Sequence, residues 1–378
     1  MTDFSIKAPF PYFGGKSRAA SAVWSALGDV EHYVEPFAGS LAVLLRRPHL
    51  ANRTYYSETV NDLDGLLVNF WRAVQAEPEA VAHFASWPVA EADQHARHLA
   101  ILKWRSDEML LRLCGDADFY DAKIAGYWVW GLCCWVGSGW CSGVGPWVAD
   151  ADGRFVKQPK TGRGVKRQKP HISDDGQGVN KPHLREPGVH RKKPHISDDG
   201  RGVNKPHLRE PGVGEPHPMT MPKLLQWVRT LSARLRHVRI LNGDWSRCVT
   251  KGTTHTLSVR QGGVAGVFLD PPYGAEATKD RRAYEHNSST VAQDVAKWCL
   301  EHGDDDRLRI VLAGFEVEHT ALEAAGWRVV DWYEGAGEFA LLKGGYGKGS
   351  AKGSQMHRDR LWLSPACLGG KGSQTSLF

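Results

Sequence analysis

A segment with an internal repeat and many Gly and Pro residues divides this chain into two parts. The sequence KPHISDDGQGVNKPHLREPGV (169–189) recurs as KPHISDDGRGVNKPHLREPGV (193–213), with a period of 24 residues. Gly and Pro at this density form neither helices nor a core, so we expect residues 150–218 to be stacked short turns or an extended arm. Predicted strands and helices alternate on both sides of this segment. The sequence therefore predicts one α/β sheet domain into which the middle of the chain is inserted.

Apolar periodicity predicts the elements of both parts. Before the insertion we expect strands at Tyr33–Glu35 and Arg53–Ser57, helices at Leu41–Arg46 and from Asn61 onward, and mainly helical structure over 78–136. After the insertion we expect helices at Pro222–Leu235, Val291–Leu300 and Val317–Ala325, and strands at Val238–Leu241, Val264–Leu269, Arg309–Leu312 and Trp327–Trp332.

The basic charge of the chain is concentrated in the insertion. The 378 residues include 48 Lys and Arg against 42 Asp and Glu, a formal charge of +6, and residues 157–215 alone hold 14 basic and 7 acidic side chains. A localised basic segment indicates either a polyanionic partner or a solvated insertion without a partner. The hydrophobic fraction of 42% and the charged fraction of 24% exclude a disordered chain and a fibrous repeat.

We expect no membrane span, no disulfide framework and no metal site. Residues 124–149 carry no charge but contain six Gly, a Pro and two Ser, which predicts a buried helix that continues into a loop rich in Gly and Trp. The seven Cys are odd in number and form no C-x-x-C pair, which is typical of a reducing compartment. The N-terminus lacks the pattern of a signal peptide, so we expect a cytoplasmic protein.

The segment FLDPPYG (268–274) carries the strongest chemical signal. The apolar run Val264–Leu269 predicts a buried strand, so Asp270 lies at its carboxyl end, where open α/β sheets bind ligands. Pro271 and Pro272 hold the chain extended and remove two backbone donors, and Tyr273 adds a flat aromatic face. A carboxylate, a carbonyl and a stacking ring suit a planar base with an exocyclic amine.

Two Gly turns near the N-terminus provide weaker signals. YVEPFAGS (33–40) predicts a strand, a Gly turn and a helix, an arrangement in which the backbone approaches a nucleotide-type ligand closely. In PYFGGKS (11–17), Gly14 and Gly15 also allow close approach, and Lys16 can meet a ligand carboxylate.

Together these three segments resemble the Dam-like, alpha-class adenine-N6 DNA methyltransferases, and we expect a protein of a bacterium or a phage. The order FGGK, P-F-x-G, long middle region and D-P-P-Y is similar to that family over about residues 9–75 and 238–365. The resemblance implies a Rossmann-like α/β methyltransferase sheet that uses S-adenosylmethionine. It also implies transfer of a methyl group to the exocyclic amine of an adenine flipped out of duplex DNA at a specific site, as in restriction-modification.

The resemblance implies a role for each matching residue. The expected cofactor contacts are Tyr12, Gly14, Gly15, Lys16, Glu35, Pro36, Phe37, Gly39, Asp62, Asp244, Trp245 and Asp270. Lys16 would neutralise the methionine carboxylate, and Asp62 would bind the ribose hydroxyls, with Glu58 as the alternative because it lies nearer the expected strand end. Asp244 would accept a hydrogen bond from the cofactor adenine, and Trp245 would pack on that ring.

The expected catalytic residues are Asp270, Pro271, Pro272 and Tyr273. Hydrogen bonds from the adenine amine to the Asp270 carboxylate and the Pro271 carbonyl would aim the nitrogen lone pair at the sulfonium methyl, and Tyr273 would stack on the flipped base. Asp as the first residue of this motif favours adenine, whereas Ser would favour the cytosine amine.

One residue departs from the family pattern, because Leu41 stands where P-F-x-G-x-G has its final Gly. A differently shaped turn would follow. The alternatives are therefore a cytosine-N4 or RNA amino methyltransferase and, from a different class, a DNA-binding protein that has lost catalysis.

The family order also predicts the domain organisation. We expect a catalytic part at 1–76, a target-recognition region at 77–221 with repeats at 169–216, a second catalytic part at 222–366 and a flexible tail at 367–378. Candidate phosphate contacts lie in the basic runs at Lys166, Arg167, Lys169, Arg191, Lys192 and Lys193. Most of the Trp residues that precede these runs are expected in the core.

The tail ends in Gln374–Phe378, which resembles the pentapeptides that bind the bacterial sliding clamp. We expect the protein in the bacterial nucleoid or in a phage-infected host. The sequence leaves open the recognition site, a partner endonuclease, the oligomeric state, the role of the repeats and the choice between Glu58 and Asp62.

Overall fold

The computed structural model describes two large portions of the chain on either side of the insertion. The described residues are 6, 8–10, 16–48, 56–134, 140–141, 147–149, 155–157, 221–272, 290–315, 318–332 and 359–369. The repeats at 169–216, the six candidate phosphate contacts and the pentapeptide at the C-terminus lie outside the described residues. Tyr12, Gly14, Gly15 and Tyr273 lie outside them as well.

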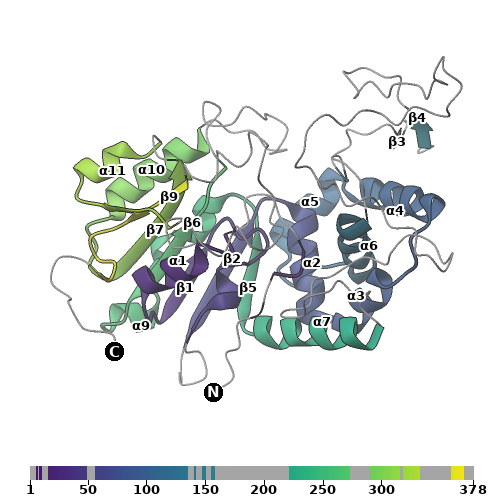
Figure 1. Cartoon of the computed structure of the whole chain (residues 1–378), viewed down its shortest axis with the longest axis horizontal. Coiled ribbons are helices and arrows are strands. Elements are labelled where there is room, and N and C mark those ends of the chain that lie inside the picture. Colours follow the sequence, from purple (N-terminus) through teal and green to yellow (C-terminus); the bar gives the residue numbers. More distant parts are fainter. Residues whose placement is uncertain are drawn as a thin grey trace, which may run out of the picture.

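A seven-stranded sheet forms the centre of the molecule (Figure 1). Its order is β5-β2-β1-β6-β7-β9-β8, in which neighbouring strands from β5 to β7 are parallel and β9 is antiparallel to both of its neighbours. The strands are β1 (His32–Glu35), β2 (Ser57–Asp62), β5 (Val238–Asn242), β6 (Ala265–Leu269), β7 (Leu308–Phe315), β8 (Arg328–Val330) and β9 (Asp359–Leu363). This mixed α/β sheet confirms the predicted Rossmann-like fold.

The sheet is buried on both faces because two apolar clusters cover it. Consecutive residues of β6 belong to different clusters, since Phe268 packs in one cluster and its neighbours Val267 and Leu269 pack in the other. Side chains alternate between the two faces of a strand, so each cluster marks one face. The uninterrupted apolar sequence of β6 therefore matches a parallel strand with both faces covered.

Helices cover the two faces and extend beyond the β5 edge. Figure 1 shows α3 to α7 gathered beside β5, and α10 and α11 beside β7 and β9. Helix α6 packs on α2, α3 and α4, and α7 packs on α2 and α3. The helices are α1 (Ala20–Leu27), α2 (Gly65–Ala76), α3 (Pro78–Ala85), α4 (Glu91–Trp104), α5 (Asp107–Gly115), α6 (Ala122–Cys134), α7 (Met221–Leu235), α8 (Lys251–Thr254), α9 (Leu257–Arg260), α10 (Val291–His302) and α11 (Thr320–Ala324), with 3-10 turns η1 (Leu44–Arg46) and η3 (Trp245–Cys248).

Helix α2 illustrates how local sequence sets an element. Asp64 is its N-cap, and its side chain accepts hydrogen bonds from the backbone N–H groups of Leu66 and Leu67. The apolar residues at helical spacing, including Phe70 and Trp71, are buried. The predicted start near Asn61 is therefore a few residues early, because Asn61 and Asp62 still belong to β2.

Most predicted elements are confirmed, and four need correction in addition to the start of α2. The second strand is Ser57–Asp62 rather than Arg53–Ser57, and the helix expected at Leu41–Arg46 is a single 3-10 turn. The third correction is strand β9, which no periodicity indicated because it pairs antiparallel between β7 and β8 late in the chain. The fourth is a short antiparallel pair, β3 (Trp147–Ala149) with β4 (Phe155–Lys157), in a stretch expected to be loop.

The uncharged stretch 124–149 begins within α6, whose Ile124, Trp128 and Trp130 are buried. This confirms the buried helix expected there. Among the described helices, none combines the length and apolar character needed to cross a membrane.

Candidate functional site

The strand order reverses between β1 and β6, which makes this position the candidate ligand site. The chain passes from β1 to β2 and later to β5 on one side, whereas β6 and β7 continue the sheet on the other side. Open α/β sheets bind ligands beyond the carboxyl ends of the strands at such a reversal. Glu35 ends β1 and Asp270 follows β6, so both carboxyl groups lie at this position.

Asp270 forms an ion pair with Lys16. The Lys16 Nζ atom lies 2.8 Å from the Asp270 Oδ1 atom, and the exposed fractions of the two side chains are 4% and 19%. Burial raises the pKa of Asp270, and the adjacent ammonium group acts in the opposite direction. Lys16 of the FGGK segment and Asp270 of the D-P-P-Y motif therefore meet in space. Pro271 is buried and Pro272 half-buried directly beyond Asp270.

The P-F-A-G turn is fastened to the end of β2. The Gly39 N–H donates to Asp62 Oδ2 at 2.8 Å, and the Ala38 N–H donates to the Asn61 carbonyl at 2.9 Å. The Asn61 side chain donates to the Pro36 carbonyl at 3.0 Å and to the Gly243 carbonyl at 2.9 Å. Asn61 thus ties the turn after β1 to the segment after β5, and the carboxyl ends of three strands form one edge.

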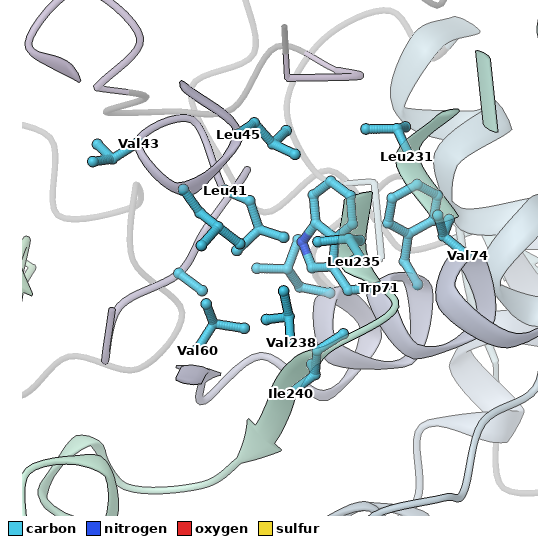
Figure 2. Packing of buried hydrophobic residues seen from close by; sticks show 14 of the residues in the cluster. Leu41, Val43, Leu45, Val60, Trp71, Val74, Leu231, Leu235, Val238 and Ile240 are labelled. Carbon is cyan, nitrogen blue, oxygen red and sulfur yellow. The ribbon is translucent and has the colours of Figure 1, made fainter. Parts of the chain in front are cut away.

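Leu41 has the left-handed backbone that normally favours glycine. Its φ is 55°, close to the 49° of Gly39 in the same turn. The side chain is fully buried, and Figure 2 shows it in the cluster with Leu45, Val60 and Trp71. Burial of the leucine offsets the backbone cost of this conformation. The turn keeps left-handed backbone at position 41 without a glycine.

Glu58 and Asp62 lie at opposite ends of β2. Asp62 is the last residue of β2, at the carboxyl edge, and burial raises its pKa to about 6. Glu58 lies near the start of β2 with a fully buried side chain, 3.1 Å from Arg47 and 2.7 Å from Arg234. Glu58 therefore holds two arginines away from the edge, and the expectation that it lies nearer the strand end was wrong.

Asp244 and Trp245 follow β5 at the same edge. Asp244 is exposed and caps η3, with its Oδ1 atom accepting from the Ser246 N–H at 2.9 Å. Trp245 is 8% exposed and stacks on Phe37, with 6.1 Å between ring centroids. Trp298 packs against its edge. Core packing thus occupies most of the Trp245 ring, and through Phe37 it supports the P-F-A-G turn.

Glu35 has an environment that differs from that of Asp270. It is buried, and its Oε2 atom accepts a hydrogen bond from the Tyr33 hydroxyl at 3.0 Å. Burial raises the pKa of Glu35 to about 8. The side chain is therefore protonated and uncharged at neutral pH.

Several residues shape this edge through contacts that no motif predicts. Asn61, Tyr33 and the arginines around Glu58 act through contacts of their side chains. Arg72 is similar, since it donates to the Ile240 carbonyl at 3.0 Å and to the Leu113 carbonyl at 3.0 Å, joining α2, β5 and α5. The sequence signal for each is at most a polar residue in an apolar stretch.

A known family matches a part of the chain that includes residues of this edge. Residues 12–95 match the family model of the D12 class N6 adenine-specific DNA methyltransferase. The match supports the resemblance of the chain to the Dam-like adenine methyltransferases. This methyltransferase is thus an enzyme that modifies the N6 position of adenine in DNA. The matched residues contain Lys16, the P-F-A-G turn and Asp62, whereas Asp270 lies outside them. No curated protein matches the chain significantly.

The family finding also decides between the alternatives considered for the sequence. It favours adenine-N6 methylation of DNA over a cytosine or RNA amino methyltransferase, and an enzyme over a binding protein without catalysis. The left-handed backbone of Leu41 fits this outcome, because the turn does not need a glycine to adopt that conformation.

Proposed function

We propose that this methyltransferase transfers the methyl group of S-adenosylmethionine to an adenine flipped out of duplex DNA, and that Asp270 orients the amine. The observation that carries the proposal is the position of Asp270, which follows a buried strand at the reversal of strand order and is succeeded by two prolines. A largely buried acceptor at such a position can act on a planar base that enters the site.

The residues at the carboxyl edge fit the proposed cofactor. Asp62 and Asp244 end or follow neighbouring strands and present carboxylate oxygens suited to ribose hydroxyls and an adenine amine. Asp62 already accepts hydrogen bonds from the backbone N–H groups of Gly39, Asp64 and Leu63, which fixes its orientation. A carboxylate has about four acceptor sites, so a ribose hydroxyl can still bind. Trp245 supports this site through Phe37 rather than by stacking on the cofactor.

Bound in this way, S-adenosylmethionine supplies an electrophilic methyl group on a sulfonium sulfur. The chain contributes positioning and charge. Asp270 and the Pro271 carbonyl accept hydrogen bonds from the adenine amine, and so direct its nitrogen lone pair. Asp270 also provides a base for the proton that the amine loses. Lys16 has two candidate partners at this site, the methionine carboxylate and the Asp270 carboxylate that it contacts.

The remaining assignments extend the proposal to DNA binding. Tyr12, Gly14 and Gly15 complete the cofactor site and Tyr273 stacks on the flipped base. The basic runs at 166–169 and 191–193 contact phosphates. The catalytic parts are 1–76 and 222–366, with target recognition at 77–221. The family supports a DNA substrate. Duplex DNA, and docking of Gln374–Phe378 to a sliding clamp, are proposals that rest on the sequence.

The substitution Asp270→Asn tests the assignment of Asp270. The variant keeps the shape of the side chain but loses the charged acceptor, so single-turnover formation of N6-methyladenine should fall at least about 100-fold. The product is measured by mass spectrometry of nucleosides from duplex DNA of mixed sequence. The matched control is Asp294→Asn, an exposed carboxylate on α10, which should retain wild-type turnover. Near-normal turnover by Asp270→Asn would refute the role of Asp270.

A further inference from the structure

The ion pair between Lys16 and Asp270 brings together two residues that the motifs assign to different ligands. The family resemblance implies that Lys16 binds the methionine carboxylate and that Asp270 binds the adenine amine. In the structure the Lys16 ammonium group lies 2.8 Å from Asp270 Oδ1, and the Lys16 side chain is almost completely buried. A buried ammonium group next to a carboxylate is costly to separate from it, because little water replaces the lost partner.

The carboxylate of Asp270 needs a counter-charge to function as an acceptor. A protonated aspartic acid would present a donor where the adenine amine also presents donors. Burial raises the pKa of Asp270 and so favours that unproductive form. An ammonium group within hydrogen-bond distance favours the charged form instead.

A second carboxyl group that interacts with Asp270 is Glu35, at the end of β1, whose pKa the charge of Asp270 raises further. Burial raises the pKa of Glu35 to about 8, so at neutral pH it carries no charge and does not compete for the ammonium group. Among the described residues, Lys16 is therefore the side chain that balances the charge of Asp270.

We propose that Lys16 is a positioning residue for Asp270, which it keeps charged and orients by binding Oδ1, so that the second oxygen accepts the amine of the target adenine. The inference rests on the proposed function of Asp270 and deepens it. Lys16 then belongs to the site of the target base, and the methionine carboxylate depends on other donors.

The pH dependence of single-turnover methyl transfer tests this role. We compare Lys16→Gln, which keeps a donor of similar length without the charge, with Lys16→Arg, which keeps the charge. Loss of the charge should move the acidic limb of the rate profile of Lys16→Gln upward by about 1 to 3 pH units. The Lys16→Arg variant should keep its limb near that of the wild type. A profile that stays in place in Lys16→Gln would overturn the proposal.

A binding measurement without catalysis provides the second readout. Calorimetry compares S-adenosylhomocysteine, which has the amino-acid carboxylate, with 5′-methylthioadenosine, which lacks it. Under the proposal, Lys16→Gln changes the two affinities by a similar factor. A loss of about 10-fold or more for S-adenosylhomocysteine alone would assign Lys16 to the methionine carboxylate and overturn the proposal. Retained binding of either ligand also shows that the variant is folded.

Two different outcomes would contradict the proposed function and the role of Lys16. A wild-type protein that forms no N6-methyladenine under any condition contradicts the proposed function. An active wild type whose acidic limb is unchanged in Lys16→Gln contradicts the role of Lys16 alone.

Discussion

The left-handed backbone of Leu41 leads to a quantitative prediction about stability. Leu41 is 0% exposed with a φ of 55°, whereas Leu45, at 1% exposed, lies in the 3-10 turn η1 of the same cluster. Truncation of either leucine to alanine should lower the free energy of unfolding by about 2 to 5 kcal/mol, because each leaves a cavity. The informative comparison is the further step from alanine to glycine at each site.

The two sites should respond differently to that step. At position 45 the glycine variant loses a buried Cβ and gains unfolded-state entropy, so it should be about 1 to 2 kcal/mol less stable than the alanine variant. At position 41 the same losses occur, but glycine relieves about 1 to 2 kcal/mol of left-handed strain that alanine retains. The alanine and glycine variants at position 41 should therefore be nearly equal in stability.

Urea unfolding of the four variants measures these steps, provided that the m-values agree with that of the wild type. The difference between the two alanine-to-glycine steps isolates the backbone term, because cavity effects largely cancel. An equal cost of the step at both positions would refute the argument that Leu41 carries strain offset by burial.

Three further predictions concern buried charge, acid stability and the insertion. Glu58→Gln leaves Arg47 and Arg234 without their anionic partner, so urea unfolding should show a loss of about 3 to 5 kcal/mol; a loss below 1 kcal/mol would contradict this. Burial lowers the pKa of His319 to about 4 in the folded state, compared with about 6.5 in the unfolded state. Between pH 6.5 and pH 4 the unfolded state therefore binds one more proton than the folded state, and the free energy of unfolding decreases as the pH falls. His319→Phe should remove about 1 to 2 kcal/mol of the stability difference between pH 7.5 and pH 5, and an unchanged difference would count against this cause. Deletion of residues 169–216 should weaken DNA binding and reduce its dependence on salt concentration, if the basic runs contact phosphates; an unchanged slope in fluorescence anisotropy titrations would indicate that they do not.

The sequence by itself determined which polar side chains lie at the carboxyl ends of the strands. The apolar run before Asp270 predicts a buried strand that ends at a carboxylate, and the structure has that strand as β6. Helix α2 and most other elements follow equally from the spacing of their apolar residues and from the Asp64 cap. These features depend on interactions within one strand or one helical turn, which is why a local pattern predicts them.

Only the tertiary structure decided which of these groups meet. Pairing of β1 with β6 makes the reversal of strand order, and at that edge Lys16 contacts Asp270 rather than acting alone in its Gly turn. The start of β2 at Ser57 places Glu58 between two arginines and leaves Asp62 at the edge. Strand β9 and the left-handed Leu41 also escaped prediction, because antiparallel pairing and strain offset by burial depend on neighbours far away in the chain. A local pattern identifies the polar groups at the ends of the strands, and the order of the strands determines their partners.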